Sequence, residues 1–393
     1  MMHRPQDLHM PKIARLEISS LEYVLAKGKG YGNARGVNNR RNCSLITLTT
    51  DDGAVGIGDA SGPLGVIREY VKLLTPAFLG QSLYDFEIVA TQLRNRAYHF
   101  GAHNHFIAAL GGINIAVLDA MGKTLGLPVH DLIGGRVSEG LACYATTGYF
   151  TDDPEVTGDP KAEIAAQLAA IDLSRFTGAK IKIGAGVASD VERVRTAREI
   201  LGDNALLMVD YNGNYTVDVA LDSIRAIEPF GVTWAEEPLP PFDIKGYAEL
   251  RQRSPVAIAA GEAHCSVHDF KHLIDARAID IVQPPLTGGG GFGEMRAVAL
   301  LAQMNNLRVS LPCWGSAIAL NAAIHFAASL PRWPHTENSP YPMLVEYDVG
   351  DNPLRDLLVD DPIQPAGGEL PVPKDSGLGL RLNAEIVARY AVE

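Results

Sequence analysis

Cysteine is scarce in this chain. Its four cysteines stand singly, without CxxC spacing, which argues against a zinc knuckle and against a disulfide framework. Long hydrophobic runs are also missing, since no stretch approaches the roughly 18 apolar residues of a membrane helix. The opening residues, MMHRPQDLHMPK, lack the apolar centre of a signal peptide. We therefore expect a protein of the cytoplasm, where thiols stay reduced, with no membrane partner.

Positive charge is in deficit as well. Lysine and arginine together number 34 against 46 acidic residues, so the formal net charge is −12. That balance argues against nucleic acid or an anionic membrane surface as the main partner. It leaves a small anionic substrate open, because a bound divalent cation can reverse the field around a site. A length of 393 residues suits a barrel with a smaller second domain.

The N-terminal third has the pattern of strands followed by helices. A strand-like run at 13–24 precedes a polar loop, and the runs around 44–49 and 57 flank the turn Asp51-Asp52-Gly53. Helical periodicity follows over 66–125 and stops at Gly126-Leu127-Pro128. This order predicts an α+β domain, to which we assign residues 1–138.

From Leu141 onward the rhythm is that of a barrel. Short apolar runs typical of buried parallel strands recur at 143–146, 179–183, 206–210, 232–236, 257–261, 279–283, 307–311 and 343–347. Helical patterns lie between most of them, for example at 190–201, 217–228 and 293–304. This alternation predicts a (β/α) barrel over residues 139–355. The Pro- and Gly-rich segment 356–393 is expected to return to the N-terminal domain.

Three acids stand at the ends of consecutive strand runs. Asp210 closes LLMVD, Glu236 closes VTWAE and Glu262 follows AIAAG, at equal spacings of 26 residues. Chemistry in such barrels is located where strands end, so the three carboxylates should converge at one mouth of the barrel. Clustered carboxylates repel one another unless a hard cation neutralises them, and oxygen ligation suits Mg²⁺. The spacing therefore predicts a metal site.

Two lysines occupy the strand before the first acid. In the run 179–183, Lys180 and Lys182 share one strand face and the isoleucines share the other. If the isoleucines face the helices, the lysines point into the barrel, where ammonium groups need anionic company. Like-charge repulsion and desolvation should lower the pKa of one lysine and make it usable as a base.

The segments KIK, VDYNGN, WAEEP and AGE, with GINIAVLDAMGKTLGLPVHDLIGG, resemble the enolase superfamily, and within it the mandelate racemase and muconate lactonizing enzyme branch. The similarity runs from DDGAVGIGDA to the C-terminal GLGL. It implies an α/β fold, a (β/α)7β TIM-like barrel with an N-terminal α+β capping domain that the C-terminal tail completes. It also implies one Mg²⁺, for which Mn²⁺ could substitute, and a homo-oligomer between dimer and octamer.

The resemblance also implies a reaction. A base removes the α-proton of a small carboxylate substrate, and the resulting enediolate is stabilised by the cation. The three acids above match the metal ligands, Lys182 matches the base and Lys180 its electrostatic partner. Glu346, in MLVEYD, matches the acid that hydrogen-bonds the substrate carboxylate. Asn212 is expected to contact the substrate or the ligands.

One part of the family pattern is missing. Many members carry a second base, a His after the seventh strand paired with an Asp after the sixth, and here Pro312 and Pro285 stand at those positions. Neither side chain transfers a proton, so we expect chemistry on a single face of the enediolate. That favours syn β-elimination (dehydration) or lactone cycloisomerisation of a sugar acid. The motifs KIKIG, GGGGFGE and NPLR are most similar to galactarolactone cycloisomerases and acid-sugar dehydratases.

Two alternatives stay open. An epimerase or racemase could use an unrecognised second base, for which His264 is the best candidate. A catalytically silent carboxylate-binding homologue is the other, although the retained lysine pair argues against it. Specificity is expected from two cap loops, about 27–42 with Arg35 and about 95–105 with Tyr98. Trp314, after the seventh strand run, should line the site.

Overall fold

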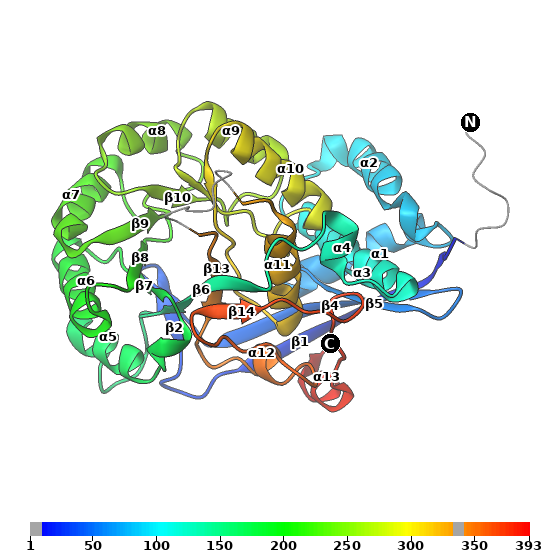
Figure 1. The fold of residues 1–393 in the computed structure, drawn as a ribbon, viewed down its shortest axis with the longest axis horizontal. Coiled ribbons are helices and arrows are strands. Elements are labelled where there is room, and N and C mark those ends of the chain that lie inside the picture. Colours follow the sequence, from blue (N-terminus) through cyan, green and yellow to red (C-terminus); the bar gives the residue numbers. More distant parts are fainter. Residues whose placement is uncertain (1–9, 333–341) are drawn as a thin grey trace.

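The structure, a computed structural model, describes residues 10–332 and 342–393. Figure 1 shows two lobes: a ring of helices around a set of strands, and beside it a smaller sheet covered by helices. We call the larger lobe the barrel and the smaller lobe the cap. The C-terminus ends beside the cap sheet, far along the chain from the strands with which it pairs.

The cap is built on an antiparallel sheet. Its strands lie in the order β15 (Ala391–Val392), β1 (Ile13–Val24), β4 (Arg40–Thr50) and β5 (Val55–Asp59). Helices α1 (Leu64–Phe78), α2 (Phe86–Ala97), α3 (His105–Leu125) and α4 (Val129–Ile133) follow. The strand β5 can approach α3 closely because it carries glycine, since a Cβ on Gly56 would lie 2.0 Å from the carbonyl oxygen of Ala116. This contact fixes the cap sheet against its central helix.

The barrel strands follow one another in parallel. They are β6 (Gly140–Thr147), β7 (Gly178–Lys182), β8 (Leu206–Asp210), β9 (Val232–Glu236), β10 (Ile258–Ala260), β11 (Ile281–Val282), β12 (Arg308–Val309) and β13 (Val345–Asp348). The ring closes where Leu311, just after β12, pairs with Val345 of β13. The amide of Leu311 donates to the carbonyl of Leu344 at 3.0 Å, and its own carbonyl accepts from Glu346 at 3.0 Å.

Helices surround these strands. They are α5 (Pro160–Ala169), α6 (Val187–Leu201), α7 (Val217–Ile227), α8 (Ile244–Arg253), α9 (Val267–Asp275), α10 (Gly291–Met304) and α11 (Ala317–Ser329). The chain ends with α12 (Pro353–Asp356), β14 (Glu369–Pro371) and α13 (Ala384–Tyr390). Strand β14 pairs with the start of β6, and β15 pairs with β1. The last residues therefore contact both lobes.

The predicted fold class is confirmed: strands and helices alternate around a closed parallel barrel, with a separate α+β cap. The boundaries 1–138, 139–355 and 356–393 stay predictions. The polar loop 27–42 contains a hairpin that was not anticipated, formed by β2 (Tyr31–Asn33) and β3 (Gly36–Asn38). Short glycine-containing strands with exposed polar residues lack the apolar alternation by which a strand is recognised.

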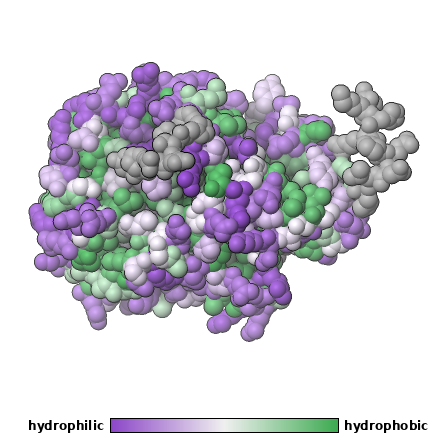
Figure 2. Space-filling model, in the orientation of Figure 1, coloured by the Kyte–Doolittle hydropathy of each residue, from purple (hydrophilic) through white to green (hydrophobic). Residues whose placement is uncertain are grey.

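Helix α3 is long and apolar enough to cross a membrane by length and composition, but 83% of its apolar window is buried inside the protein. Helix α3 is therefore the core helix of the cap. The face drawn in Figure 2 mixes hydrophilic and apolar side chains over both lobes. The compartment and the oligomeric state stay predictions.

Candidate active site

The strand ends bring the predicted acids and lysines together. Lys182 and Asp210 are paired in register at the ends of β7 and β8, and Asp210 is paired with Glu236 at the end of β9. Glu262 lies two residues after β10. The side chains of Asp210 and Glu236 are fully buried. The equal spacing in the sequence thus corresponds to neighbouring positions at one rim of the barrel.

A layer of apolar and aromatic residues lies beneath the acids inside the barrel. It contains Tyr144, Met208, Trp234, Ala259, Ile281 and Leu344. Met208 and Trp234 each stand two residues before an acid, and alternate residues of a strand point to the same side. The acids are therefore the next layer toward the C-terminal ends of the strands, where TIM-barrel enzymes have their active sites.

Lys180 lies among the carboxylates. Its side chain is fully buried, and its Nζ forms an ion pair with Glu236. The same nitrogen lies 3.2 Å from Oε1 of Glu346 and 3.7 Å from Oδ2 of Asp210. Lys182 stands nearer the rim, with its Nζ donating to Oδ2 of Asp210 at 2.5 Å. Both lysines point into the barrel, where anionic partners offset the cost of burying them.

Glu346 is held from two sides. The hydroxyl of Thr146, on β6, donates to Oε1 of Glu346 at 2.5 Å. The amide of Cys313, after β12, donates to Oε2 at 2.8 Å. A carboxylate fixed by hydrogen bonds on both oxygens has one orientation, so Glu346 can serve as a rigid group at the substrate position.

The acids influence one another strongly. Burial raises the pKa of Glu236 to about 8, with Lys180 opposing the shift. Burial and the neighbouring Asp210 also raise the pKa of Glu262. Burial alone would raise the pKa of Asp210, but Lys182 and Lys180 outweigh it and lower that pKa. Without a cation, Glu236 and Glu262 are therefore protonated more readily than free carboxyl groups, while the charge of Asp210 is stabilised by the two lysines.

The prediction that one lysine has a lowered pKa is wrong for the protein without a bound cation. Burial lowers the pKa of Lys182, but Asp210 raises it, and the net pKa is above the ordinary value. The same competition, with Glu236 and Glu346 as the raising groups, leaves the pKa of Lys180 well above its ordinary value. The carboxylates that face the two lysines raise the lysine pKa values by more than burial and the repulsion between the lysines lower them.

The donor set fits a hard divalent cation. Asp210, Glu236 and Glu262 supply oxygens at three adjacent strand ends, and Oδ1 of Asn212 is buried without a hydrogen-bond partner among the described residues. Within those residues, however, no three acidic, His or Cys side chains already converge as a finished cation site. The two ammonium groups now hold the carboxylates, so the side chains would have to rotate to bind Mg²⁺.

Three residues of the acid cluster were not predicted from the sequence. The side-chain amide of Gln283 donates to Oε2 of Glu236 at 2.7 Å, and the indole of Trp234 donates to the same oxygen at 3.1 Å. Glu237 has a positive φ of 40°, is buried, and its Oε1 lacks a partner among the described residues. A signal existed for Gln283, which closes the sixth strand run as the acids close theirs.

The five predicted substrate contacts occupy different places. The side-chain amide of Asn212 donates to Oε1 of Glu262 at 3.3 Å, inside the acid cluster. Arg35, in the cap hairpin, donates from Nη2 to the carbonyl of Gly213 at 2.7 Å and so lies over the loop after β8. Trp314 is 41% exposed and its ring centroid lies 5.1 Å from that of Tyr31.

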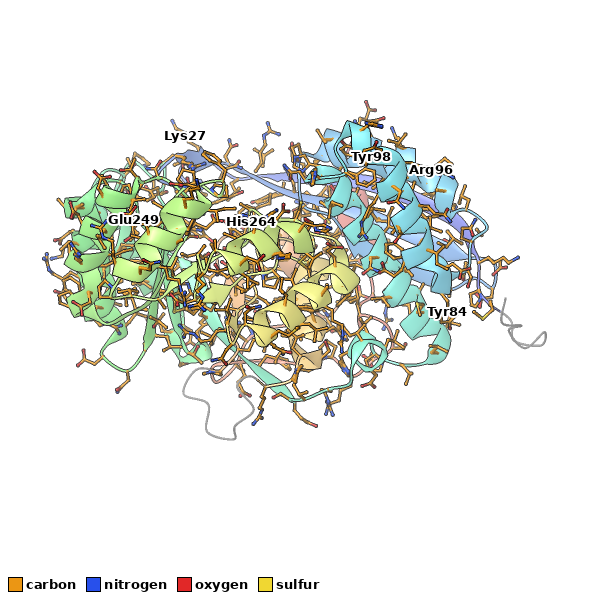
Figure 3. The ribbon with its side chains drawn as sticks, turned by 90° about the horizontal axis from the view of Figure 1, so that it is seen from above. Lys27, Tyr84, Arg96, Tyr98, Glu249 and His264 are labelled. Carbon is orange, nitrogen blue, oxygen red and sulfur yellow. The ribbon has the colours of Figure 1, made fainter. Side chains whose placement is uncertain are left out.

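His264 and Tyr98 differ in their burial. The Nδ1 of His264 is buried without a described partner, and burial lowers its pKa against the opposing effect of Asp269. Tyr98, in the short 3-10 helix η2 (Tyr98–Phe100), is 69% exposed and packs on His99 at 3.9 Å between ring centroids. Figure 3 shows Lys27 and Tyr98 at the same edge of the molecule, with His264 between them. The substrate roles of all five stay predictions.

The two prolines lie in the loops after β11 and β12, as the sequence predicted. Cys313, next to Pro312, is buried, and burial together with Glu346 raises the pKa of its thiol far above the ordinary value. It is therefore a poor proton carrier near neutral pH. Among the described residues of these two loops, no side chain is suited to replace the missing His–Asp pair.

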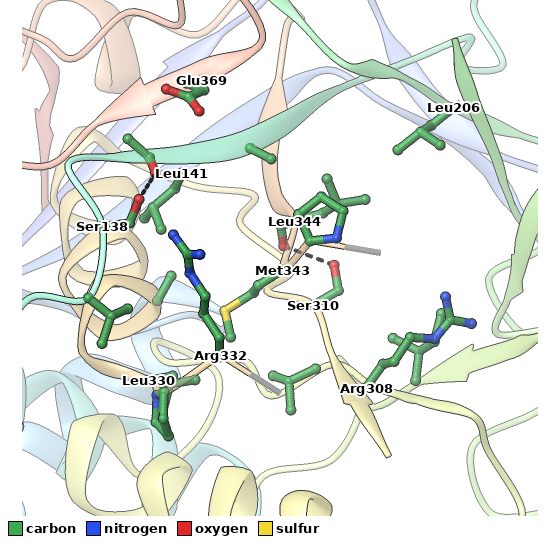
Figure 4. Close-up of a pocket in the computed structure, with 18 of the residues that line it drawn as sticks. Ser138, Leu141, Leu206, Arg308, Ser310, Leu330, Arg332, Met343, Leu344 and Glu369 are labelled. Carbon is green, nitrogen blue, oxygen red and sulfur yellow. Dashed lines mark hydrogen bonds between the residues drawn. The ribbon is translucent and has the colours of Figure 1, made fainter. Parts of the chain in front are cut away.

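A separate cavity lies at the opposite end of the barrel. It measures about 410 Å³ and is lined by the first residues of several strands, including Gly140, Leu206 and Arg308. Figure 4 shows Arg332 and Met343 at its wall, on either side of residues 333–341, which lie outside the described ranges. Because barrel enzymes react at the other end of the strands, this cavity is not the active site.

Comparison with known proteins places the chain in a family. The family described as "Enolase C-terminal domain-like" matches residues 163–386, and "Mandelate racemase / muconate lactonizing enzyme, N-terminal domain" matches residues 30–134. The chain is 32% identical to the D-galactarolactone cycloisomerase of Agrobacterium fabrum, over 89% of this chain and 92% of that protein. It is 29% identical to the arabinonate dehydratase of Saccharolobus solfataricus, over 87% and 89%.

A solved structure supports the same conclusion. A racemase from Streptomyces coelicolor A3(2) with bound magnesium is 26% identical and superposes with a TM-score of 0.82, covering 97% of this chain and all of that one. The chain thus belongs to the enolase superfamily, in its mandelate racemase and muconate lactonizing enzyme branch. The predicted resemblance is confirmed, and its named relatives are lyases and isomerases of sugar acids and lactones.

Proposed function

We propose that the protein is a Mg²⁺-dependent lyase or cycloisomerase of a sugar acid or its lactone, with Lys182 as the base. The observation that carries this proposal is the asymmetry of the site: an ammonium group beside Asp210 on one side, and Pro312 with a buried thiol on the other. A single base on one face suits elimination and cycloisomerisation better than inversion.

Asp210, Glu236 and Glu262 would hold the cation, which when bound supplies positive charge to stabilise the enediolate of the substrate. A ligand role for Asp210 removes the carboxylate that now raises the pKa of Lys182. Burial and the neighbouring Lys180 remain and lower that pKa, with Glu346 as the remaining group that raises it. Lys182 would then be neutral often enough to accept the α-proton near neutral pH.

The other residues of the site bind and orient the substrate carboxylate. Lys180 stays charged and faces the substrate carboxylate, while Glu346, held by Thr146 and Cys313, fixes that carboxylate in place. After taking the α-proton, Lys182 returns it on the same face. The acceptor is either a leaving hydroxyl, which departs as water, or the β-carbon of the enol formed when elimination of the ring carboxylate opens a lactone, and that enol then loses its hydroxyl proton to become the keto acid. The relatives support both outcomes, since one is a cycloisomerase and another a dehydratase.

A screen in D₂O separates the outcomes. The protein is incubated with Mg²⁺ and a set of acid sugars and lactones, and the products are followed by NMR. The proposal expects a keto-deoxy acid or a rearranged lactone that needs Lys182. The matched control is Lys271→Met, because Lys271 is exposed and pairs with Asp275 on the surface of α9. Unimpaired turnover by Lys182→Met would contradict the proposal.

A second candidate is an epimerase in which His264 is the other base. The observation in its favour is the buried Nδ1 of His264, which has no hydrogen-bond partner in the part of the chain that the structure describes. Burial also lowers the pKa of this imidazole. In the same screen this alternative gives deuterium at C2 with inverted configuration, and His264→Gln abolishes that product. Deuterium incorporation with retention in both parent and His264→Gln excludes it.

A further inference from the structure

A fully buried arginine stands directly behind the base. Arg193 comes from α6, and its Nε donates to the carbonyl oxygen of Lys182 at 2.8 Å. Its Nη2 donates to the carbonyl of Gly148 at 2.5 Å, and its Nη1 forms an ion pair with Glu163 of α5. A buried guanidinium is tolerated only when its N–H groups find such partners.

Two strand ends meet at this guanidinium. Gly148 follows the last residue of β6, and Lys182 is the last residue of β7. The amide of Lys182 donates to the carbonyl of Gly148 at 3.2 Å, so Arg193 adds a second donor to the same oxygen. The backbone hydrogen bonds that pair β6 with β7 end at this point. Beyond it, the hydrogen bonds from Arg193 hold the backbone in place.

The same guanidinium reaches the cap through Phe150. Its carbon Cζ lies 4.1 Å from the centroid of the Phe150 ring. The amide of Phe150 donates to the carbonyl of Gly32 at 3.1 Å, which joins this segment to the cap hairpin of β2 and β3. Beside this bond, the rings of Tyr31 and Tyr149 pack at 5.8 Å. The hairpin is therefore seated on the loop after β6.

The hairpin also spans the base from the other side. Arg35, between β2 and β3, donates to the carbonyl of Gly213 in the loop after β8. Because β7 lies between β6 and β8 in the sheet, the hairpin contacts the loops on both sides of the strand that carries Lys182. A shift of the hairpin would therefore be passed through these contacts to the strand that carries Lys182.

We propose that Arg193 is a positioning residue that couples the seating of the cap hairpin, residues 31–38, to the placement of Lys182. The inference rests on the proposed role of Lys182 as base. A shift of about 1 Å at a reacting group can cost two orders of magnitude in rate, so a device that fixes the Lys182 backbone would affect turnover more than binding. A purely structural arginine would affect only the unfolding equilibrium.

The test compares Arg193→Lys with Arg195→Met. Lysine keeps a positive charge opposite Glu163 but lacks the fork that spans two carbonyls. Arg195 lies two residues along the same helix, is 45% exposed and pairs with Glu192, so it is a matched control. Turnover is measured on D-galactarolactone, or on the acid sugar that the D₂O screen returns, and amide hydrogen exchange is measured on the proteins without substrate.

For Arg193→Lys we expect kcat to fall about tenfold or more with KM within about threefold of the parent, and the amides of 31–38 and 148–150 to exchange faster. Arg195→Met should match the parent in both. An unchanged kcat refutes the positioning role, and unchanged exchange of the hairpin refutes the coupling. Because exchange needs no substrate, it decides the coupling even if Lys182→Met shows that the proposed reaction is wrong.

Discussion

The side-chain amide of Gln283 donates a hydrogen bond of 2.7 Å to Oε2 of Glu236, a predicted ligand of the cation. Both side chains are fully buried, so the bond orients the carboxylate without competition from water. Partners that orient metal ligands typically contribute 10- to 100-fold to metal affinity. Gln283→Leu should therefore weaken Mg²⁺ binding by about that factor, as titration calorimetry would measure. Gln303→Leu, at a half-buried position of α10 that lines the cavity at the opposite end of the barrel, is the control and should bind as the parent does.

Removal of a ligand should have a larger effect. Glu236→Gln keeps the shape of the side chain but takes away one of three negative charges, so we expect Mg²⁺ affinity to fall by more than about a hundredfold. Glu249→Gln, which alters an exposed carboxylate paired with Arg253, should leave it unchanged. Equal affinities for Glu236→Gln and the parent would show that the three acids are not the ligands.

A buried ion pair joins the cap to the barrel. Nη1 of Arg41, on β4, lies 2.9 Å from Oδ2 of Asp348, on β13, and both side chains are 2% exposed. Loss of one partner leaves an uncompensated buried charge, so Arg41→Met and Asp348→Asn should each lower the free energy of unfolding by about 3–5 kcal/mol.

The double variant should lose less than the sum of the two single losses, because no buried charge is then left unpaired. Arg40→Met is the control, since Arg40 forms an exposed pair with Glu22 and should cost about 1 kcal/mol or less. Urea unfolding of the parent, the two single variants and the double variant gives the coupling energy of the double-mutant cycle. Strict additivity would mean that the pair does not couple the two lobes.

A buried histidine should make stability depend on pH. Burial lowers the pKa of His325 to about 4, and its ring stacks on His130 at 5.1 Å. The unfolded chain binds the proton below its ordinary pKa of about 6.5, while the folded chain does so only below about 4. The contribution of the neutral His325 to the free energy of unfolding is thus complete above pH 6.5 and is lost as the pH falls toward 4.

The measurement is the difference in unfolding free energy between the parent and His325→Gln. It should shrink by roughly 2–3 kcal/mol from pH 7 to pH 4.5, because one pKa unit corresponds to about 1.4 kcal/mol. His272→Gln, at an exposed position of α9, should show no such trend relative to the parent. A constant difference for His325→Gln would contradict the buried, neutral histidine.

Most of the fold and the centre of the site could be predicted because they depend on local patterns. The runs that end at Asp210 and Glu236 coincide with β8 and β9, since a buried parallel strand is a continuous apolar run and its polar end is visible in the sequence. The cap hairpin was missed because β2 and β3 are three residues long each and are held by contacts with distant segments such as Phe150.

The charges were harder to predict than the positions. The sequence placed Lys180 and Lys182 inside the barrel, but the direction of their pKa shifts depends on how many carboxylates lie within a few ångströms. The contribution of Arg193 was also hidden, because a buried arginine on an outer helix looks like any other in a charged segment. Such long-range partners emerge only when the chain is folded.

The most direct test of the account is the rate at which Lys182→Met exchanges the α-proton of a turned-over sugar acid with D₂O, relative to the parent and to Lys271→Met. If Lys182 is the single base, the exchange rate of Lys182→Met falls by at least about a thousandfold while Lys271→Met exchanges as the parent does. Exchange by Lys182→Met at the parental rate would contradict the account, because another group would then remove the proton.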